Sequence, residues 1–131
     1  MTLPVTAITA ALLTLWLTVL SLRVIALRGN PIFAFFAFGR ERPGVLERAI
    51  RGHGNLTEYA PIFICLMLLA ELGGAPTGRL VLLASMFGVG RLMHGTAFCF
   101  TGPNLVLRIG GMVCTLTALA TLSLSLLLQV V

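Results

Sequence analysis

Apolar residues fill four long segments of this chain, and short stretches rich in glycine and proline separate them. The segments run from about Pro4 to Leu27, Gly44 to Leu72, Thr77 to Phe100 and Asn104 to Val130. Each is near or above the ~20 residues that an α-helix needs to cross the hydrocarbon core of a bilayer. The pattern therefore predicts an all-α fold, an integral membrane four-helix bundle, with residues 1–131 forming a single transmembrane domain.

The breaks between the segments carry the signals of helix ends. They read GNP from Gly29, GGAP from Gly73 and TGP from Thr101. Glycine and proline are the strongest local interruptions of regular structure, and proline is tolerated in the first turn of a helix. We expect each helix after the first to begin close to a proline.

The amino-acid composition is typical of a membrane protein and indicates which kind of ligand it could bind. The chain is 58% hydrophobic and 10% charged, whereas a soluble domain is about a quarter charged. The chain has nine basic residues, all arginines, and four acidic residues, all glutamates, which gives a net charge of +5. Arginine makes planar, bidentate contacts with carboxylates and phosphates, so this usage indicates anion recognition. The arginines are scattered among apolar runs, which argues against nucleic acid as a partner.

The three cysteines give no sign of a metal centre or a disulfide framework. Cys65, Cys99 and Cys114 lie far apart in apolar runs, and they form no C-x-x-C pair. Small buried side chains are the ordinary use of such cysteines. No metal ligand set is therefore expected.

Arginine placement predicts how the chain sits in the membrane. Arg28, Arg40 and Arg42 flank the first connection, Arg79 marks the second, and both termini lack Arg and Lys. The positive-inside rule places the first and third connections in the cytoplasm and both termini outside it. The first connection, GNPIFAFFAFGRERP, has two readings: an interfacial anchor, or a flap over a site for apolar substrates.

Polar residues interrupt the second segment at regular intervals. Arg48, Arg51, Asn55 and Glu58 are spaced 3, 4 and 3 residues apart. At ~100° per residue they fall within about 80° of one another, so they form one polar stripe on an apolar helix. Charged residues inside a membrane are costly and commonly mark functional sites.

The third and fourth segments add polar groups at a similar depth. Arg91, His94 and Phe98 are spaced 3 and 4 residues apart, and Arg108 lies near the start of the fourth segment. In the predicted topology these residues and the polar stripe of the second segment share the cytoplasmic half of the membrane. We expect them to form a single site.

Charge in this site favours an anionic ligand. Four arginines face mainly Glu58, which leaves positive charge that a polyanion would neutralise. Glu58 could hold either an arginine or the ammonium of a ligand, and Asn55 could orient a ligand through its amide. A structural alternative remains for each residue, because Glu58 could pair with an arginine and Asn55 could join two helices by a hydrogen bond.

Two motifs resemble those of a known family. ERAIRGHGNLTEYAPIF and GRLMH, set within four spans of this length, are similar to the membrane-associated proteins in eicosanoid and glutathione metabolism, the MAPEG family. The similarity to bacterial members, which carry IRxHGNxxEYxPI and GRLMH, extends over essentially the whole chain. The core R-x-x-x-N-x-x-E-Y-x-P is the most specific part.

The resemblance implies a homotrimer in the bacterial inner membrane that binds glutathione between subunits, in the cytoplasmic half of the bilayer. It implies a glutathione S-transferase, and a peroxidase activity as well, acting on a lipophilic electrophile or hydroperoxide that arrives from the membrane lipids. Arg108 matches the arginine that stabilises the glutathione thiolate. The positions that match glutathione-binding residues are Arg28, Arg51, Asn55, Glu58, Tyr59, Arg91 and His94.

This sequence departs from the family pattern at two places. Phe98 stands where tyrosine is common, so no role of that hydroxyl carries over, and the connection between GRLMH and Arg108 differs slightly in length. Two other functions stay open: a non-catalytic membrane protein that binds glutathione or lipid, and a small multispan transporter. Small exporters usually carry an essential acid in their first helix, and the first segment here has none.

Overall fold

The computed structural model describes residues 3–130, which form four long α-helices and one short 3-10 helix. All four α-helices are long and apolar enough to cross a membrane. Each predicted helix boundary lies within one residue of the observed one, so the all-α four-helix fold is confirmed. The elements are α1 (Pro4–Leu27), η1 (Pro31–Phe36), α2 (Val45–Leu72), α3 (Thr77–Cys99) and α4 (Leu105–Val130).

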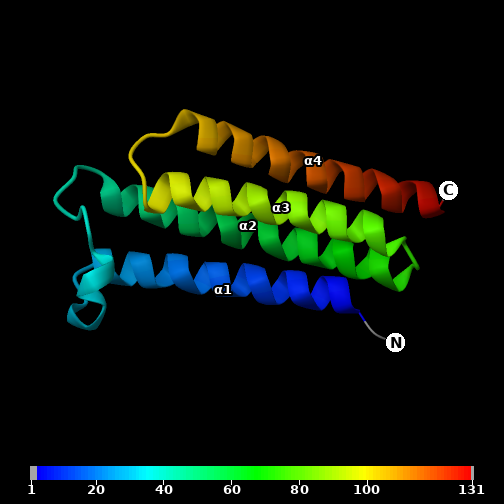
Figure 1. The fold of residues 1–131 in the computed structure, drawn as a ribbon, viewed down its shortest axis with the longest axis horizontal. Helices are drawn as coiled ribbons and strands as arrows, with labels where there is room; N and C mark the ends of the chain where they lie inside the picture. The colour runs from blue at the N-terminus through cyan, green and yellow to red at the C-terminus, as the bar shows by residue number, and fades with distance from the viewer. Residues whose placement is uncertain (1–2, 131) are drawn as a thin grey trace.

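The helices run up and down in one bundle, with α2 and α3 between α1 and α4 (Figure 1). Helix α1 packs on α2 and α3, while α4 packs mainly on α3 and to a smaller extent on α2. The η1 segment and the α3–α4 connection lie at one end of the bundle (Figure 1). The start of α1, the α2–α3 connection and the end of α4 lie at the other. The first and third connections therefore share an end, as the sequence predicted.

Aromatic stacking and close backbone contact hold the centre of the bundle. Phe63 of α2 and Phe87 of α3 are fully buried, and their rings stack with centroids 3.9 Å apart. A Cβ at Gly90 would lie 2.8 Å from the carbonyl oxygen of Gly111. Only glycine allows α3 and α4 to approach so closely at this crossing, in the way that small residues permit tight packing of membrane helices.

Glu71, near the end of α2, caps the start of α1. Its two carboxylate oxygens accept hydrogen bonds from the backbone N–H groups of Val5 and Thr6, at 3.0 and 2.8 Å. The first N–H groups of a helix have no partner within the helix, and the N-terminal end of the helix dipole attracts negative charge. One carboxylate thus joins two helices at the end of the bundle that lies away from the arginines of α2.

A buried arginine stabilises the opposite end of the bundle through hydrogen bonds to two other segments. Arg23 of α1 is 1% exposed, and its Nε donates to the carbonyl oxygen of Cys99 at 3.0 Å. Its Nη1 and Nη2 donate to the carbonyl oxygens of Phe36 and Phe38. The guanidinium carbon also lies 4.0 Å from the ring centroid of Phe38. Arg23 therefore ties the phenylalanine-rich connection and the end of α3 to α1.

The phenylalanine-rich connection exposes part of its apolar surface. Ile32, Phe35 and Phe38 are 76%, 71% and 52% exposed. The neighbouring Arg40 and Arg42 are exposed as well. Mixed aromatic and basic exposure at one end of a membrane bundle is typical of the membrane–water interface, which fits the interfacial anchor better than a flap closed over the site.

Candidate functional site

Arg91 occupies the centre of the polar cluster between α2, α3 and α4. It is 2% exposed, and each of its three guanidinium nitrogens has a protein acceptor. Its Nη1 donates to the side-chain oxygen of Asn55 on α2. Its Nε and Nη2 donate to the hydroxyl of Thr115 on α4 at 2.9 and 2.6 Å. A buried cation needs such compensation, and here α2 and α4 supply it to an arginine of α3.

Thr115 is a member of this cluster that the sequence analysis missed. It is fully buried, and its hydroxyl donates to the carbonyl oxygen of Gly111 at 2.7 Å while it accepts from Arg91. Backward bonding of a threonine hydroxyl to the fourth residue before it is a common arrangement within helices. The hydrogen bond to Gly111 directs the lone pairs of the Thr115 hydroxyl toward Arg91. Thr115 therefore orients the guanidinium.

Aromatic rings complete the surroundings of Arg91. The guanidinium carbon lies 5.2 Å from the ring centroid of Tyr59 and 5.9 Å from that of Phe87. Guanidinium groups within about 6 Å of a ring centroid are attracted to its face. Asn55, Tyr59 and Arg91, which the sequence assigned to one site, are thus brought together.

A second group of predicted residues lies next to this cluster, toward the end of α3. The rings of His94 and Phe98 stack with centroids 4.7 Å apart. The guanidinium carbon of Arg108 lies 5.2 Å from the Phe98 centroid on the other helix. His94 is 5% exposed, whereas Arg108 is exposed. The three side chains therefore form a series from a buried imidazole to an accessible cation.

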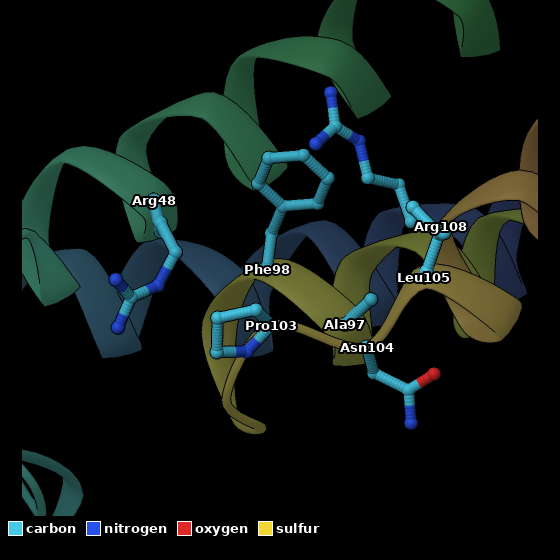
Figure 2. Close-up of a pocket in the computed structure, with 7 residues that line it drawn as sticks. All are labelled: Arg48, Ala97, Phe98, Pro103, Asn104, Leu105 and Arg108. Atoms are coloured by element: carbon cyan, nitrogen blue, oxygen red, sulfur yellow. The ribbon is translucent and has the colours of Figure 1, made fainter.

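A cavity of about 150 Å³ lies beside Phe98 and Arg108. Figure 2 shows both of these side chains directed toward α2, with the guanidinium of Arg48 pointing away from them. The other lining residues come from the end of α3 and the start of α4, where the Asn104 side chain accepts a hydrogen bond from the Leu107 N–H at 3.1 Å. Its volume is below the ~300–1,000 Å³ of typical ligand pockets, so it has room for part of a ligand.

Three predicted residues lie apart from these contacts. Arg51 and Glu58 are exposed on α2, on the same helix face as Asn55. Arg28 is exposed at the C-terminal end of α1. The chain thus presents one cation and one anion on the outer surface of a membrane-spanning helix, a costly arrangement unless another surface covers them.

A larger apolar groove lies between α1 and α2. It has a volume of about 420 Å³ and no charged group in its lining, which includes Leu13, Leu17, Leu56 and Pro61. It therefore lacks the positive charge that favours an anion. The cavity beside Arg108 is smaller, but it has the charge that the sequence predicted for the site.

Comparison with known proteins identifies the family of this chain. The sequence model described as "MAPEG family" matches residues 6–128. The chain is 44% identical over 62 residues to the inner membrane protein YecN of Escherichia coli K12, and equally to YecN of Escherichia coli O6:H1. Each alignment covers 47% of this chain and 47% of the relative, so the chain spans about half the length of the curated relatives it matches.

No solved structure matches the chain. The family match covers almost all of the sequence, from the first turn of α1 nearly to the end of α4. The four membrane-spanning helices agree with it. The protein is an integral membrane protein that belongs to the MAPEG family.

Proposed function

We propose that this protein binds glutathione and activates its thiol for attack on lipophilic electrophiles or hydroperoxides, as a glutathione S-transferase with peroxidase activity. The observation that carries the proposal is the exposed guanidinium of Arg108, held over Phe98 beside a cavity. Arg91 has its donors occupied within the protein, whereas Arg108 is accessible to a ligand. Family membership makes glutathione the expected ligand.

The charges of glutathione match those of the site. The tripeptide has two carboxylates, one ammonium and a thiol. Arg51 and Arg28 are accessible partners for carboxylates, and Glu58 for the ammonium. Asn55, held by Arg91, would then orient the peptide backbone. In this arrangement Arg91 and His94 act from behind the binding surface, since both are buried.

Arg108 is the residue that would activate the thiol of glutathione, by lowering its pKa. A free thiol has a pKa near 8.5, and a nearby cation lowers it because the thiolate is then stabilised. Each unit of lowering corresponds to ~1.36 kcal/mol. The thiolate attacks an electrophilic carbon, a sulfur–carbon bond forms, and the leaving group departs with its electron pair. With a hydroperoxide, the thiolate attacks the terminal oxygen, the O–O bond breaks and the alcohol is released; a second glutathione then gives the disulfide and water.

A second copy of the chain would complete the site. Arg51 and Glu58 are exposed on a helix that crosses the membrane, where charged side chains that face lipid are costly. The cavity beside Arg108 is also too small for a whole tripeptide. Both observations support a site shared with a second copy, and the family resemblance implies that the assembly is a homotrimer with glutathione between subunits. Native mass spectrometry in detergent should give three chains per particle; a monomer at all concentrations would contradict it.

The location proposed for the protein is the bacterial inner membrane. The matched E. coli relatives carry the name "inner membrane protein". Arg28 directly follows α1, and Arg40 and Arg42 lie between η1 and α2, so these exposed arginines belong to the end of the bundle that holds the η1 segment. The positive-inside rule puts that end in the cytoplasm, where glutathione is available.

Activity of the purified protein tests the proposal. In detergent, the wild type should consume glutathione with an aryl halide or a lipid hydroperoxide, and Arg108→Ser should lose most of this activity. Arg79→Ser is the matched control, because Arg79 is an exposed arginine at the other end of the bundle. Glutathione binding without turnover would favour a non-catalytic binder. Absence of binding, together with solute movement in proteoliposomes, would favour a transporter.

A further inference from the structure

We infer that Phe98 is a positioning residue that holds the Arg108 guanidinium beside the cavity through the face of its ring. The inference rests on the proposed function and assigns a role to the residue at which this chain departs from the common tyrosine. The guanidinium carbon of Arg108 lies 5.2 Å from the Phe98 centroid. This distance is within the range at which a cation is attracted to the negative face of an aromatic ring.

Arg108 depends on this contact because little else confines it. Its side chain is long and exposed, and a free arginine side chain has about 2 kcal/mol of rotamer entropy to lose on being fixed. Among residues 3–130, the ring of Phe98 is the partner that we find for this guanidinium. Contact with a ring face restricts the side chain without using an N–H group in a hydrogen bond, so the donors stay available. The donors can therefore point at a ligand.

The Phe98 ring is itself fixed from two sides. His94 stacks on it with centroids 4.7 Å apart and an angle of 25° between the rings. On α2, a Cβ at Gly52 would lie 2.8 Å from the Cβ of Phe98, so the glycine is needed for the ring to sit where it does. Within residues 3–130, the titratable or charged groups around the ring and its cavity are His94 and Cys99 of α3, Arg48 of α2 and Arg108 of α4.

The contact explains how the site can work without a tyrosine hydroxyl. The ring face is common to phenylalanine and tyrosine, and the hydroxyl lies in the ring plane, away from the stacked cation. Phenylalanine is thus sufficient for positioning Arg108, whereas an aliphatic residue of similar volume is not. The role predicts a difference between aromatic and aliphatic substitutions that a purely space-filling role would not produce.

The test is a pH titration of bound glutathione, followed by the near-ultraviolet absorbance of its thiolate. Phe98→Tyr should keep the thiol pKa of the wild type. Phe98→Leu should raise it by about one unit, which is roughly tenfold less thiolate at a pH well below the pKa. Binding of S-methylglutathione, which has no ionisable thiol, should stay within about threefold in both variants, because the charged ends of the tripeptide are held elsewhere.

The possible outcomes distinguish a failure of this inference from a failure of the proposed function. Binding of glutathione with the same thiol pKa in Phe98→Leu and the wild type would overturn the inference and leave the function standing. Failure of the wild type to bind either ligand would overturn both. If Phe98→Leu does not fold, Phe98→Met and Gly52→Ala replace it: the first removes the ring and the second displaces it. Both should raise the thiol pKa, and an unchanged pKa in both would equally overturn the inference.

Discussion

Arg91 of α3 donates a hydrogen bond to the side-chain oxygen of Asn55 on α2, although both residues lie in helices long enough to cross a membrane. This contact joins the two motifs that define the site. It also determines the orientation of the Asn55 amide, because an oxygen that accepts from a cation leaves the NH₂ group to face outward. The buried arginine and the half-buried amide therefore act as one unit.

The hydroxyl of Thr115 on α4 should be needed to hold Arg91 in its contact with Asn55. We predict that Thr115→Val lowers stability by about 2 kcal/mol, because hydrogen bonds to charged groups contribute ~1.5–3 kcal/mol and Arg91 loses the acceptor of two nitrogens. Thermal unfolding in detergent measures the change. Thr115→Ser keeps the hydroxyl and should retain most of the stability. An unchanged melting temperature in Thr115→Val, or a larger loss in Thr115→Ser than in Thr115→Val, would contradict the prediction.

Helices α3 and α4 cross so closely at Gly90 that a side chain there should destabilise the protein. A Cβ at Gly90 would lie 2.8 Å from both the Gly111 carbonyl oxygen and the Thr115 hydroxyl oxygen. Gly90→Ala should destabilise the protein by about 1–3 kcal/mol, the usual cost of overpacking. Gly88→Ala on the same helix is the control, since its Cβ would meet nothing within 4 Å. It should leave the melting temperature unchanged or raise it slightly, and a similar loss in both variants would contradict the prediction.

Arg23 should keep the phenylalanine-rich connection in place. Arg23→Gln removes contacts with three carbonyl oxygens, and the loss of ~1.5 kcal/mol for even one charged hydrogen bond increases local opening about tenfold. Trypsin should therefore cleave after Arg40 at least several-fold faster, whereas the bond after Arg42 is protected by Pro43. Arg79→Gln, an exposed change at the other end of the bundle, should have no effect there. Equal cleavage rates in Arg23→Gln and the wild type would rule out this function of Arg23.

Glu58 offers a test of how the ligand is oriented. If it binds the ammonium of glutathione, Glu58→Gln should weaken glutathione binding about tenfold, a loss typical of a charge-assisted hydrogen bond. N-acetylglutathione has no ammonium, so it should bind the wild type and Glu58→Gln equally. Calorimetry with the two ligands and two proteins forms a double-mutant cycle. A full tenfold loss with the acetylated ligand would show that Glu58 acts elsewhere.

The sequence predicted the helices and part of the site well, for physical reasons. Prolines and glycines between apolar segments placed every α-helix boundary within one residue. The spacing that placed Asn55 on one helix face and Arg91 on another correctly brought these two faces together, whereas Tyr59, which also lies near Arg91, was assigned to the site only by the family resemblance. Helical periodicity decides which residues share a face, so it predicts convergence once the topology is known.

The burial of individual polar side chains could not be predicted in the same way. Arg23 is one arginine near the end of an apolar segment, and in sequence it is indistinguishable from one that extends to the interface. Thr115 depends on the depth at which α3 and α4 cross, and a single threonine in an apolar helix gives no sign of that depth. The exposure of Arg51 and Glu58 beside the burial of Arg91 also follows from packing and not from spacing.

Thiolate formation on the protein tests the central claim most directly. Glutathione added to the purified protein at neutral pH should show near-ultraviolet thiolate absorbance, and Arg108→Ser should abolish this signal while calorimetry still detects glutathione binding. That result would place thiol activation at Arg108. A thiolate signal of equal size in both proteins would contradict activation by Arg108, and the absence of both signal and binding in the wild type would contradict the proposed function itself.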